Sequence, residues 1–195
     1  MEAVSTEGGV MALHSIPVRP GNLREVAEQI EQATGLRVEI LGGTLMMSPT
    51  PRGKHAGIVR RLRLQLEPGL PGNLGAYEVS SVAMPDDDDD YVTPDLAVLP
   101  VEWDEAETWI ADPGDLALAV EVNSRPGDGK EEWYSRAGVE RLLVVDPGKG
   151  VWRLLARPDR VGDWDEVTEG HFGDDIELGL FDVRLSTDGL PRYDR

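Results

Sequence analysis

A glutamate inside one of the most apolar stretches of the chain constrains the fold most. Glu121 stands in Leu-Ala-Leu-Ala-Val-Glu-Val, residues 116–122, a run typical of a strand buried on both faces. An ionised carboxylate is costly to bury without a partner. The residue therefore either belongs to a site with cations or ends its strand facing solvent or an arginine. The first interpretation indicates a functional site, and the sequence leaves both open.

Two further residues could complete such a site. Pro94-Asp95 opens the preceding apolar strand, and Lys130 begins the next helix. If the strands of Asp95 and Glu121 are neighbours, their carboxylates can reach one ion, because adjacent strands lie roughly 4.8 Å apart. Carboxylates, with the backbone carbonyl of Val122 as a further oxygen, suit Mg²⁺ (or Mn²⁺). Lys130 would orient an attacking water and offset its growing negative charge. Alternatively, Asp95 caps a turn after Pro94, and Lys130 is a solvated helix residue.

The order of predicted elements is typical of a mixed α/β fold with helices on the faces of one sheet. Residues 1–20 predict an irregular arm, and residues 21–195 a single domain. A capping box at Asn22–Glu25 predicts the start of a helix, and Gly42-Gly43 predicts a hairpin turn. The pattern predicts helices at 23–33, 55–66 and 131–137, and strands at 36–41, 44–47, 76–84, 91–100, 116–122, 141–146, 151–156, 163–168 and 177–184.

Composition limits the environment and the partners. The chain has no cysteine, which excludes disulfides and thiolate metal sites. It has no apolar run long enough to span a bilayer and no signal-peptide pattern at its start, so we expect a bacterial-type cytoplasmic protein without membrane contact. The net charge of −18 opposes non-specific DNA binding, which requires lysine and arginine. Any DNA-binding surface must therefore be local.

The helix at residues 55–66 and the turn before it carry the one dense basic patch of the sequence. Its members are Arg52, Lys54, Arg60, Arg61 and Arg63. Arginine forks bind phosphates, so this is the candidate DNA surface, although the same side chains could pair with nearby carboxylates. His55 would contact phosphate or the nucleophilic water, or else hydrogen-bond the hairpin. We take Arg52, Lys54, His55 and Arg60 as candidate substrate-binding residues.

Two acidic features have competing interpretations. Glu39, on the first hairpin strand, is either a further acidic member of the site or an outward residue of an alternating strand. The aspartate run at residues 86–90 could bind a metal on paper, but a run of like charges is far more often a solvated turn.

Pro94-Asp95 and Glu121-Val122-Asn123 together resemble the PD-(D/E)xK nuclease signature, with Asn123 in place of its lysine. More of the chain resembles the Uma-two family of bacterial restriction endonucleases, from about residue 23 onward. The matching stretches are Val-Glu-Ile-Leu-Gly-Gly-Thr-Leu-Met-Met-Ser-Pro at 38–49, His55, Val-Thr-Pro-Asp-Leu-Ala-Val at 92–98, Ala-Val-Glu-Val-Asn-Ser at 119–124, Lys130 four residues before Tyr134, Ala-Gly-Val at 137–139, and Leu-Val-Val-Asp-Pro at 143–147.

This resemblance implies a restriction-endonuclease-like core, with a central mixed β-sheet flanked by helices and preceded by a helix and a β-hairpin. It also implies a Mg²⁺-dependent endonuclease that hydrolyses DNA phosphodiesters, with Asp95 and Glu121 as metal ligands. Lys130 would then replace the missing lysine. If it does not reach the site, Asp128, Glu131 or Glu132 would lie near the metal.

Cutting two strands needs two sites, so we expect a homodimer. Two alternatives to the nuclease remain. One is a weak or inactive nuclease-fold protein that acts as a binding or regulatory module. The other is a metal-dependent hydrolase of a smaller phosphoester.

Overall fold

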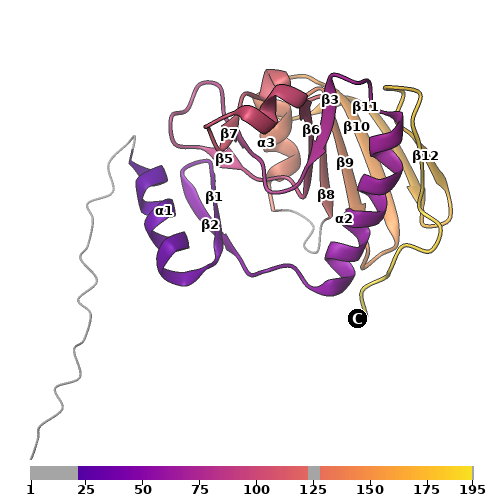
Figure 1. Cartoon of the computed structure of the whole chain (residues 1–195), viewed down its shortest axis with the longest axis horizontal. Helices are drawn as coiled ribbons and strands as arrows, with labels where there is room; N and C mark the ends of the chain where they lie inside the picture. Colours follow the sequence, from indigo (N-terminus) through magenta and orange to yellow (C-terminus); the bar gives the residue numbers. More distant parts are fainter. Residues whose placement is uncertain (1–21, 123–127, 195) are drawn as a thin grey trace, which may run out of the picture.

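Two large β-sheets, rather than the single predicted sheet, organise the computed structural model, which describes residues 22–122 and 128–194. The predicted arm at residues 1–20 and the signature position Asn123 lie outside the described residues. Figure 1 shows the elements, which are α1 Leu23–Thr34, β1 Arg37–Leu41, β2 Thr44–Ser48, α2 Gly53–Leu66, β3 Leu74–Tyr77, β4 Ser81–Ala83, β5 Tyr91–Val92, β6 Leu96–Pro100, β7 Ile110–Ala111, β8 Leu118–Val122, α3 Lys130–Ala137, β9 Arg141–Asp146, β10 Val151–Pro158, β11 Trp164–His171, β12 Asp175–Glu177 and β13 Arg184–Ser186, with short 3₁₀ turns at Glu67–Gly69, Val101–Glu105 and Pro113–Asp115. None of the helices in the described ranges is long and apolar enough to cross a membrane.

The central sheet has the order β11-β10-β9-β8-β6-β3. Only β8 and β9 pair in parallel, and the other neighbours are antiparallel. The sheet lies between α2 and α3, as Figure 1 shows. The predicted central mixed sheet with flanking helices, preceded by a helix and a hairpin, is therefore confirmed.

Alternation along β6 and β8 explains how one sheet serves both helices. Leu96, Val98, Leu118 and Val120 pack with the buried residues of α2, whereas Ala97, Leu99 and Ala119 pack with those of α3. Successive strand residues point to opposite faces, so Glu121 follows Ala119 onto the face covered by α3. The glutamate in the apolar run is thus directed at the helix that begins with Lys130.

The second sheet has the order β2-β1-β5-β4-β7 and contains the predicted hairpin. Its strands share chain segments with the central sheet, because the predicted strands 76–84 and 91–100 each divide into two. The second division lies at residues 93–95, between β5 and β6. There Thr93 N donates to the carboxylate of Glu39, and Pro94 has no N–H to donate to a ladder. Asp95 therefore lies at the joint between the sheets.

The aspartate run is a solvated turn only in part, because residues 86–88 are exposed whereas Asp89 and Asp90 are buried. Asp90 accepts hydrogen bonds from Gly42 N (2.5 Å) and Gly43 N (2.8 Å), the turn of the hairpin. Asp89 accepts from Leu23 N (2.9 Å) at the start of α1. The predicted capping box is thus replaced by a cap from a residue distant in sequence. We call Asp89 and Asp90 the aspartate clasp.

Candidate active site

The strand register brings two of the predicted residues together. In the antiparallel pair of β6 and β8, Leu96 lies opposite Val120. One residue further along, this register sets Asp95 opposite Glu121. Directly opposed residues of an antiparallel pair point to the same face, with Cβ atoms about 5 Å apart. The predicted adjacency of the two strands is confirmed, and their carboxylates lie at one edge of the sheet.

Asp95 is held by groups from three elements. Its Oδ1 lies 2.9 Å from His55 Nε2, on α2, and its Oδ2 accepts from Val122 N at 2.8 Å. The guanidinium of Arg37, on β1, approaches Oδ1 at 3.9 Å. The alternative that Asp95 only caps a local turn is wrong, since its partners lie far along the sequence.

Lys130 reaches Glu121 of this pair. Its Nζ lies 2.9 Å from Glu121 Oε1 and 2.8 Å from Glu39 Oε1. The helix starts at this position because Gly129 adopts φ +84° and Asp128 Oδ1 accepts from Lys130 N at 3.1 Å. The ammonium therefore joins Glu39 of the second sheet to Glu121 of the central sheet, and Lys130 is not a solvated surface residue.

Glu39 is buried, with 4% of its surface exposed, so its interpretation as an outward strand residue is wrong. Its Oε1 accepts from Thr93 N at 2.7 Å and binds Lys130. Glu39 thus fixes both the joint between the sheets and the ammonium of Lys130.

Tyr134 is a member of the cluster that the sequence reasoning missed. Its hydroxyl donates to Glu121 Oε1 at 2.7 Å, and the residue is fully buried. Residues four apart lie on the same helix face. The spacing from Lys130 to Tyr134 was thus the signal that both side chains approach the same carboxylate.

The environment of Glu121 opposes its ionisation. The pKa of Glu121 is raised to about 8, chiefly by burial. The positive charge of Lys130 and the Tyr134 hydroxyl oppose this rise, and the charges of Asp95 and Glu39 add to it. Burial lowers the pKa of Lys130, but the two glutamates outweigh it and leave the pKa raised. Burial and Glu121 also raise the pKa of Tyr134. Lys130 and Tyr134 are therefore protonated at neutral pH. The ionised form of Glu121 is disfavoured, so binding a proton or a cation would stabilise this residue.

The donor chemistry here fits Mg²⁺ or Mn²⁺. Opposed carboxylates from Asp95 and Glu121 supply hard oxygen ligands, and their mutual repulsion would be relieved by a divalent cation. Across the described residues, no group of three or more His, Cys, Asp or Glu side chains is arranged to hold a metal. Mg²⁺ is commonly bound by one or two carboxylates, with waters and substrate phosphates as its other ligands.

The other carboxylates suggested near the metal have different partners. Asp128 caps α3, as described above. Glu131 pairs with Arg153 at 3.0 Å, and Glu132 pairs with Arg136 at 3.5 Å.

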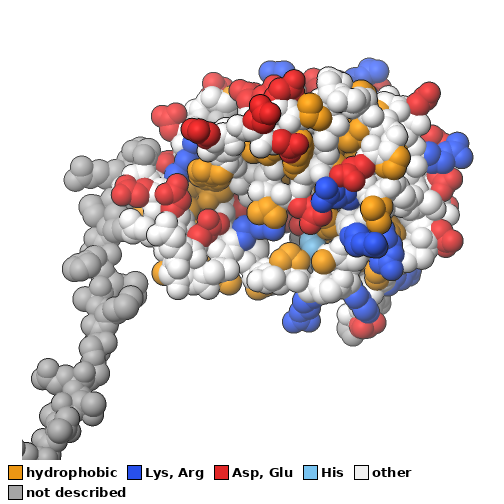
Figure 2. Space-filling model, viewed as in Figure 1, with side chains coloured by type: hydrophobic (Ala, Val, Ile, Leu, Met, Phe, Trp, Pro, Cys, Tyr) orange, Lys and Arg blue, Asp and Glu red, His pale blue; other side chains and the backbone are white. Residues whose placement is uncertain are grey.

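The predicted basic patch divides into engaged and exposed members. Lys54 binds Arg192 O and Asp194, and Arg63 pairs with Glu67 and Glu78. Arg52 and Arg60 are exposed and form no ion pair within the part of the chain that the structure describes. Lys and Arg side chains gather over and below α2 in Figure 2.

Among the described residues, the ring nitrogens of His55 contact Tyr193 and Asp95 rather than the hairpin, so the suggested hydrogen bond to the hairpin is wrong. Its suggested contact with phosphate or the nucleophilic water stays a prediction. Its Nε2 contacts Asp95, and its Nδ1 lies 3.2 Å from the hydroxyl of Tyr193. Neither Tyr193 nor Arg37 was identified from the sequence, because nothing in the local pattern around either residue points to Asp95.

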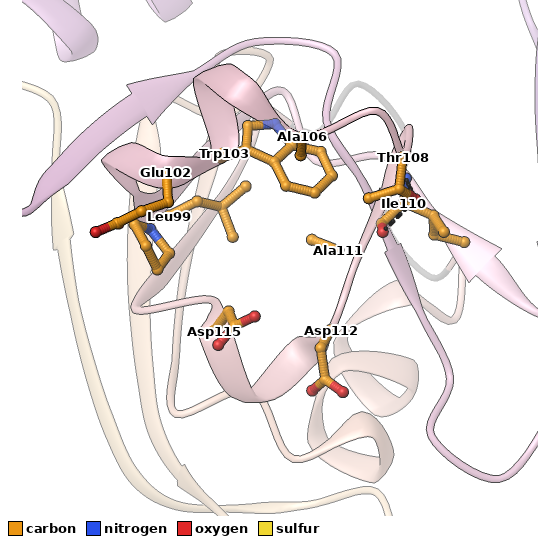
Figure 3. A pocket seen from close by; sticks show the side chains of 10 residues that line it. Leu99, Glu102, Trp103, Ala106, Thr108, Ile110, Ala111, Asp112 and Asp115 are labelled. Atoms are coloured by element: carbon orange, nitrogen blue, oxygen red, sulfur yellow. Dashed lines mark hydrogen bonds between the residues drawn. The ribbon is translucent and has the colours of Figure 1, made fainter.

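A separate pocket lies toward the other end of β6. It has a volume of about 280 Å³, and Figure 3 shows Trp103 on one wall with Asp112 and Asp115 opposite. Leu99, on its apolar side, is four strand residues from Asp95, roughly 13 Å along the strand. The pocket shares no lining residue with the carboxylate cluster.

Comparisons with known proteins identify the family and the fold. The model of the Uma2 family, described as "Putative restriction endonuclease", matches residues 24–187. The structure resembles a crystal structure titled "putative nuclease belonging to DUF820" from Anabaena variabilis ATCC 29413, with a TM-score of 0.61 and 17% sequence identity. The similarity covers 79% of this chain and 89% of that one. At this identity the likeness establishes the fold alone. No curated protein matches the sequence.

Proposed function

This chain belongs to the Uma2 family of restriction-endonuclease-like proteins, and on that premise we propose that it is a Mg²⁺-dependent endonuclease that hydrolyses DNA phosphodiester bonds. The observation that carries the proposal is the approach of Lys130 to the opposed carboxylates, with its Nζ 2.9 Å from Glu121. Position 123 is Asn rather than the lysine of the nuclease signature, and in this proposal the ammonium of Lys130, on the following helix, replaces that lysine.

In this proposal Asp95 and Glu121 hold the metal, with the carbonyl of Val122 as a further oxygen. The metal, when bound, polarises the scissile phosphate and lowers the pKa of a water. His55 and Val122 N fix the orientation of the Asp95 carboxylate. Lys130, held by Glu39, orients the attacking water and offsets the negative charge that develops on the phosphate.

The DNA-facing surface is proposed to be the exposed side of α2 and the turn before it. Arg52 and Arg60 are exposed there and can contact phosphates, and the side chain of His55 joins α2 to Asp95. Because the net charge is −18, binding depends on these few contacts. DNA affinity should therefore fall with added salt, and Arg52→Gln with Arg60→Gln should weaken it.

Cleavage of supercoiled plasmid tests the proposal. With Mg²⁺ or Mn²⁺ we expect nicking by the native chain, reduced to background in Asp95→Asn and Glu121→Gln, and no cleavage with a chelator. Asp88→Asn, an exposed aspartate outside the site, is the matched control and should cut normally. Absent or unchanged cleavage in the two site variants would refute the nuclease.

The same assay separates the alternatives. Metal-dependent hydrolysis of a small chromogenic phosphodiester without plasmid cleavage would favour the smaller phosphoester. Absence of both activities, with Lys130 in place, would favour a binding module. The acidic surface is the observation that keeps the smaller substrate in consideration.

We also propose a homodimer that pairs through β2. This strand is a sheet edge, its sequence Thr-Leu-Met-Met-Ser carries no charge, and Met46 and Met47 are exposed. Edge strands usually carry charges that prevent pairing, and two uncharged edges avoid the repulsion expected between two acidic chains. Light scattering should give twice the chain mass, and Met47→Lys should give a monomer. A native monomer would contradict this proposal.

A further inference from the structure

The segment at residues 191–194 lies against the candidate active site, although it is distant from it in sequence. Tyr193 is half-buried, and its hydroxyl lies 3.2 Å from His55 Nδ1. The other ring nitrogen of His55 lies 2.9 Å from Asp95 Oδ1. A continuous path of polar contacts therefore runs from Tyr193 through the imidazole to a proposed metal ligand.

Four contacts fix this segment independently of His55. Tyr193 N donates to Pro147 O at 3.1 Å. Lys54 Nζ donates to Arg192 O at 2.9 Å and pairs with Asp194 at 2.8 Å. The guanidinium of Arg192 lies over the ring of Phe172, 5.8 Å from its centroid. Since Lys54 precedes His55 on α2, the same segment holds both the start of the helix and the imidazole.

The chemistry of the imidazole gives this contact a direction. An ionised Asp95 accepts only, so Nε2 must donate to it. In a neutral imidazole the other nitrogen is then an acceptor, and the Tyr193 hydroxyl can donate to it. Burial, followed by the charge of Asp95, raises the pKa of Tyr193 and keeps this donor protonated. The hydrogen bond made by one ring nitrogen thus decides what the other presents.

We propose that Tyr193 is a positioning residue of the active site, whose hydroxyl fixes the His55 imidazole with its Nε2–H directed at Asp95. This inference rests on the proposed function for its consequence in catalysis, but the contact itself does not depend on it. Substitution of a group that orients a metal ligand through a hydrogen bond typically lowers metal affinity or activity by about 10–100-fold.

Tyr193→Phe is the sharpest test, because it removes one hydroxyl and keeps the ring. In the full chain we expect the ¹⁵N resonances of the His55 imidazole to move toward a mixture of tautomers, assigned by their loss in His55→Gln. Mn²⁺ affinity measured by calorimetry should fall by about 10-fold or more. The kcat for plasmid nicking should fall by a similar factor, with KM unchanged. Tyr77→Phe removes a tyrosine hydroxyl from β3, outside the site, and should change none of these.

Each outcome decides the question. Unchanged imidazole resonances in Tyr193→Phe would overturn the proposal, whether or not the native chain cuts DNA. Changed resonances with native Mn²⁺ affinity would also overturn it, because the contact would then be only structural. If the native chain does not nick plasmid, the nuclease fails, while the resonance and Mn²⁺ measurements still decide the role of Tyr193.

Discussion

The aspartate clasp and the cluster around Glu121 are both buried and acidic, but they satisfy their charges differently. Both oxygens of Asp90 accept from backbone N–H groups of one tight turn. Glu121 instead shares Oε1 between the ammonium of Lys130 and the hydroxyl of Tyr134. Backbone donors are fixed once the chain is folded, whereas these side chains are ionisable. The first arrangement holds a fold together, and the second is suited to exchange protons and cations.

The largest effect should come from removing the cation of the second cluster. Lys130→Met should reduce nicking by about 100- to 1000-fold, the loss typical of one charge-stabilising donor, while plasmid affinity changes little. Glu39→Gln should cost less, because it only loosens the ammonium. Steady-state kinetics of the two single variants and the double variant test this. If Glu39 acts through Lys130, the double variant should be no worse than Lys130→Met, and additive losses would refute that link.

A smaller effect, on stability alone, is expected from the clasp. Asp90→Ala leaves two amides of the hairpin turn without their acceptor, which costs roughly 1–3 kcal/mol. The cost is limited because Gly42 and Gly43 are exposed and water can reach them. Urea unfolding should show the loss, and Asp88→Ala, its exposed neighbour in the same run, should stay within about 0.5 kcal/mol of the native chain. Equal effects of both substitutions would contradict a structural role for the clasp.

A further effect on stability is a pH dependence of the metal-free protein. The pKa of Glu121 is about 8 in the folded chain, against about 4.3 when unfolded. Between these values the folded state holds a proton that the unfolded state has released, so the free energy of unfolding falls as pH rises through this window. Unfolding curves in chelator, at about pH 5 and about pH 8, should show a steeper decline for the native chain than for Glu121→Gln. Equal declines in the native chain and in Glu121→Gln would show that Glu121 is not the cause of the pH dependence.

How much the sequence predicts depends on whether a residue and its partner are close in the chain. Glu121 was identified because a charge in an apolar strand is costly wherever the strand lies. Lys130 begins the next helix along the chain, so the short connection from β8 to α3 keeps it close to Glu121. Asp89 and Asp90 have partners at residues 23, 42 and 43, which no local pattern connects to an aspartate run.

The same limit explains the division of the predicted strands and the missed residues. The apolar run within residues 91–100 predicted one strand, and the contact of Thr93 N with Glu39 marks where the sheets separate. Tyr193 lies 138 residues from His55. Such contacts arise from the packing of whole elements, so local periodicity carries no record of them.

The joint at residues 93–95 has a consequence for how such a protein can change over evolution. The chain leaves the second sheet at Val92 and enters the central sheet at Leu96, so Asp95 is anchored to both. Lys130 spans the same boundary through Glu39 and Glu121. The hairpin can therefore acquire new surface residues on one side of the joint while the opposed carboxylates remain on the other.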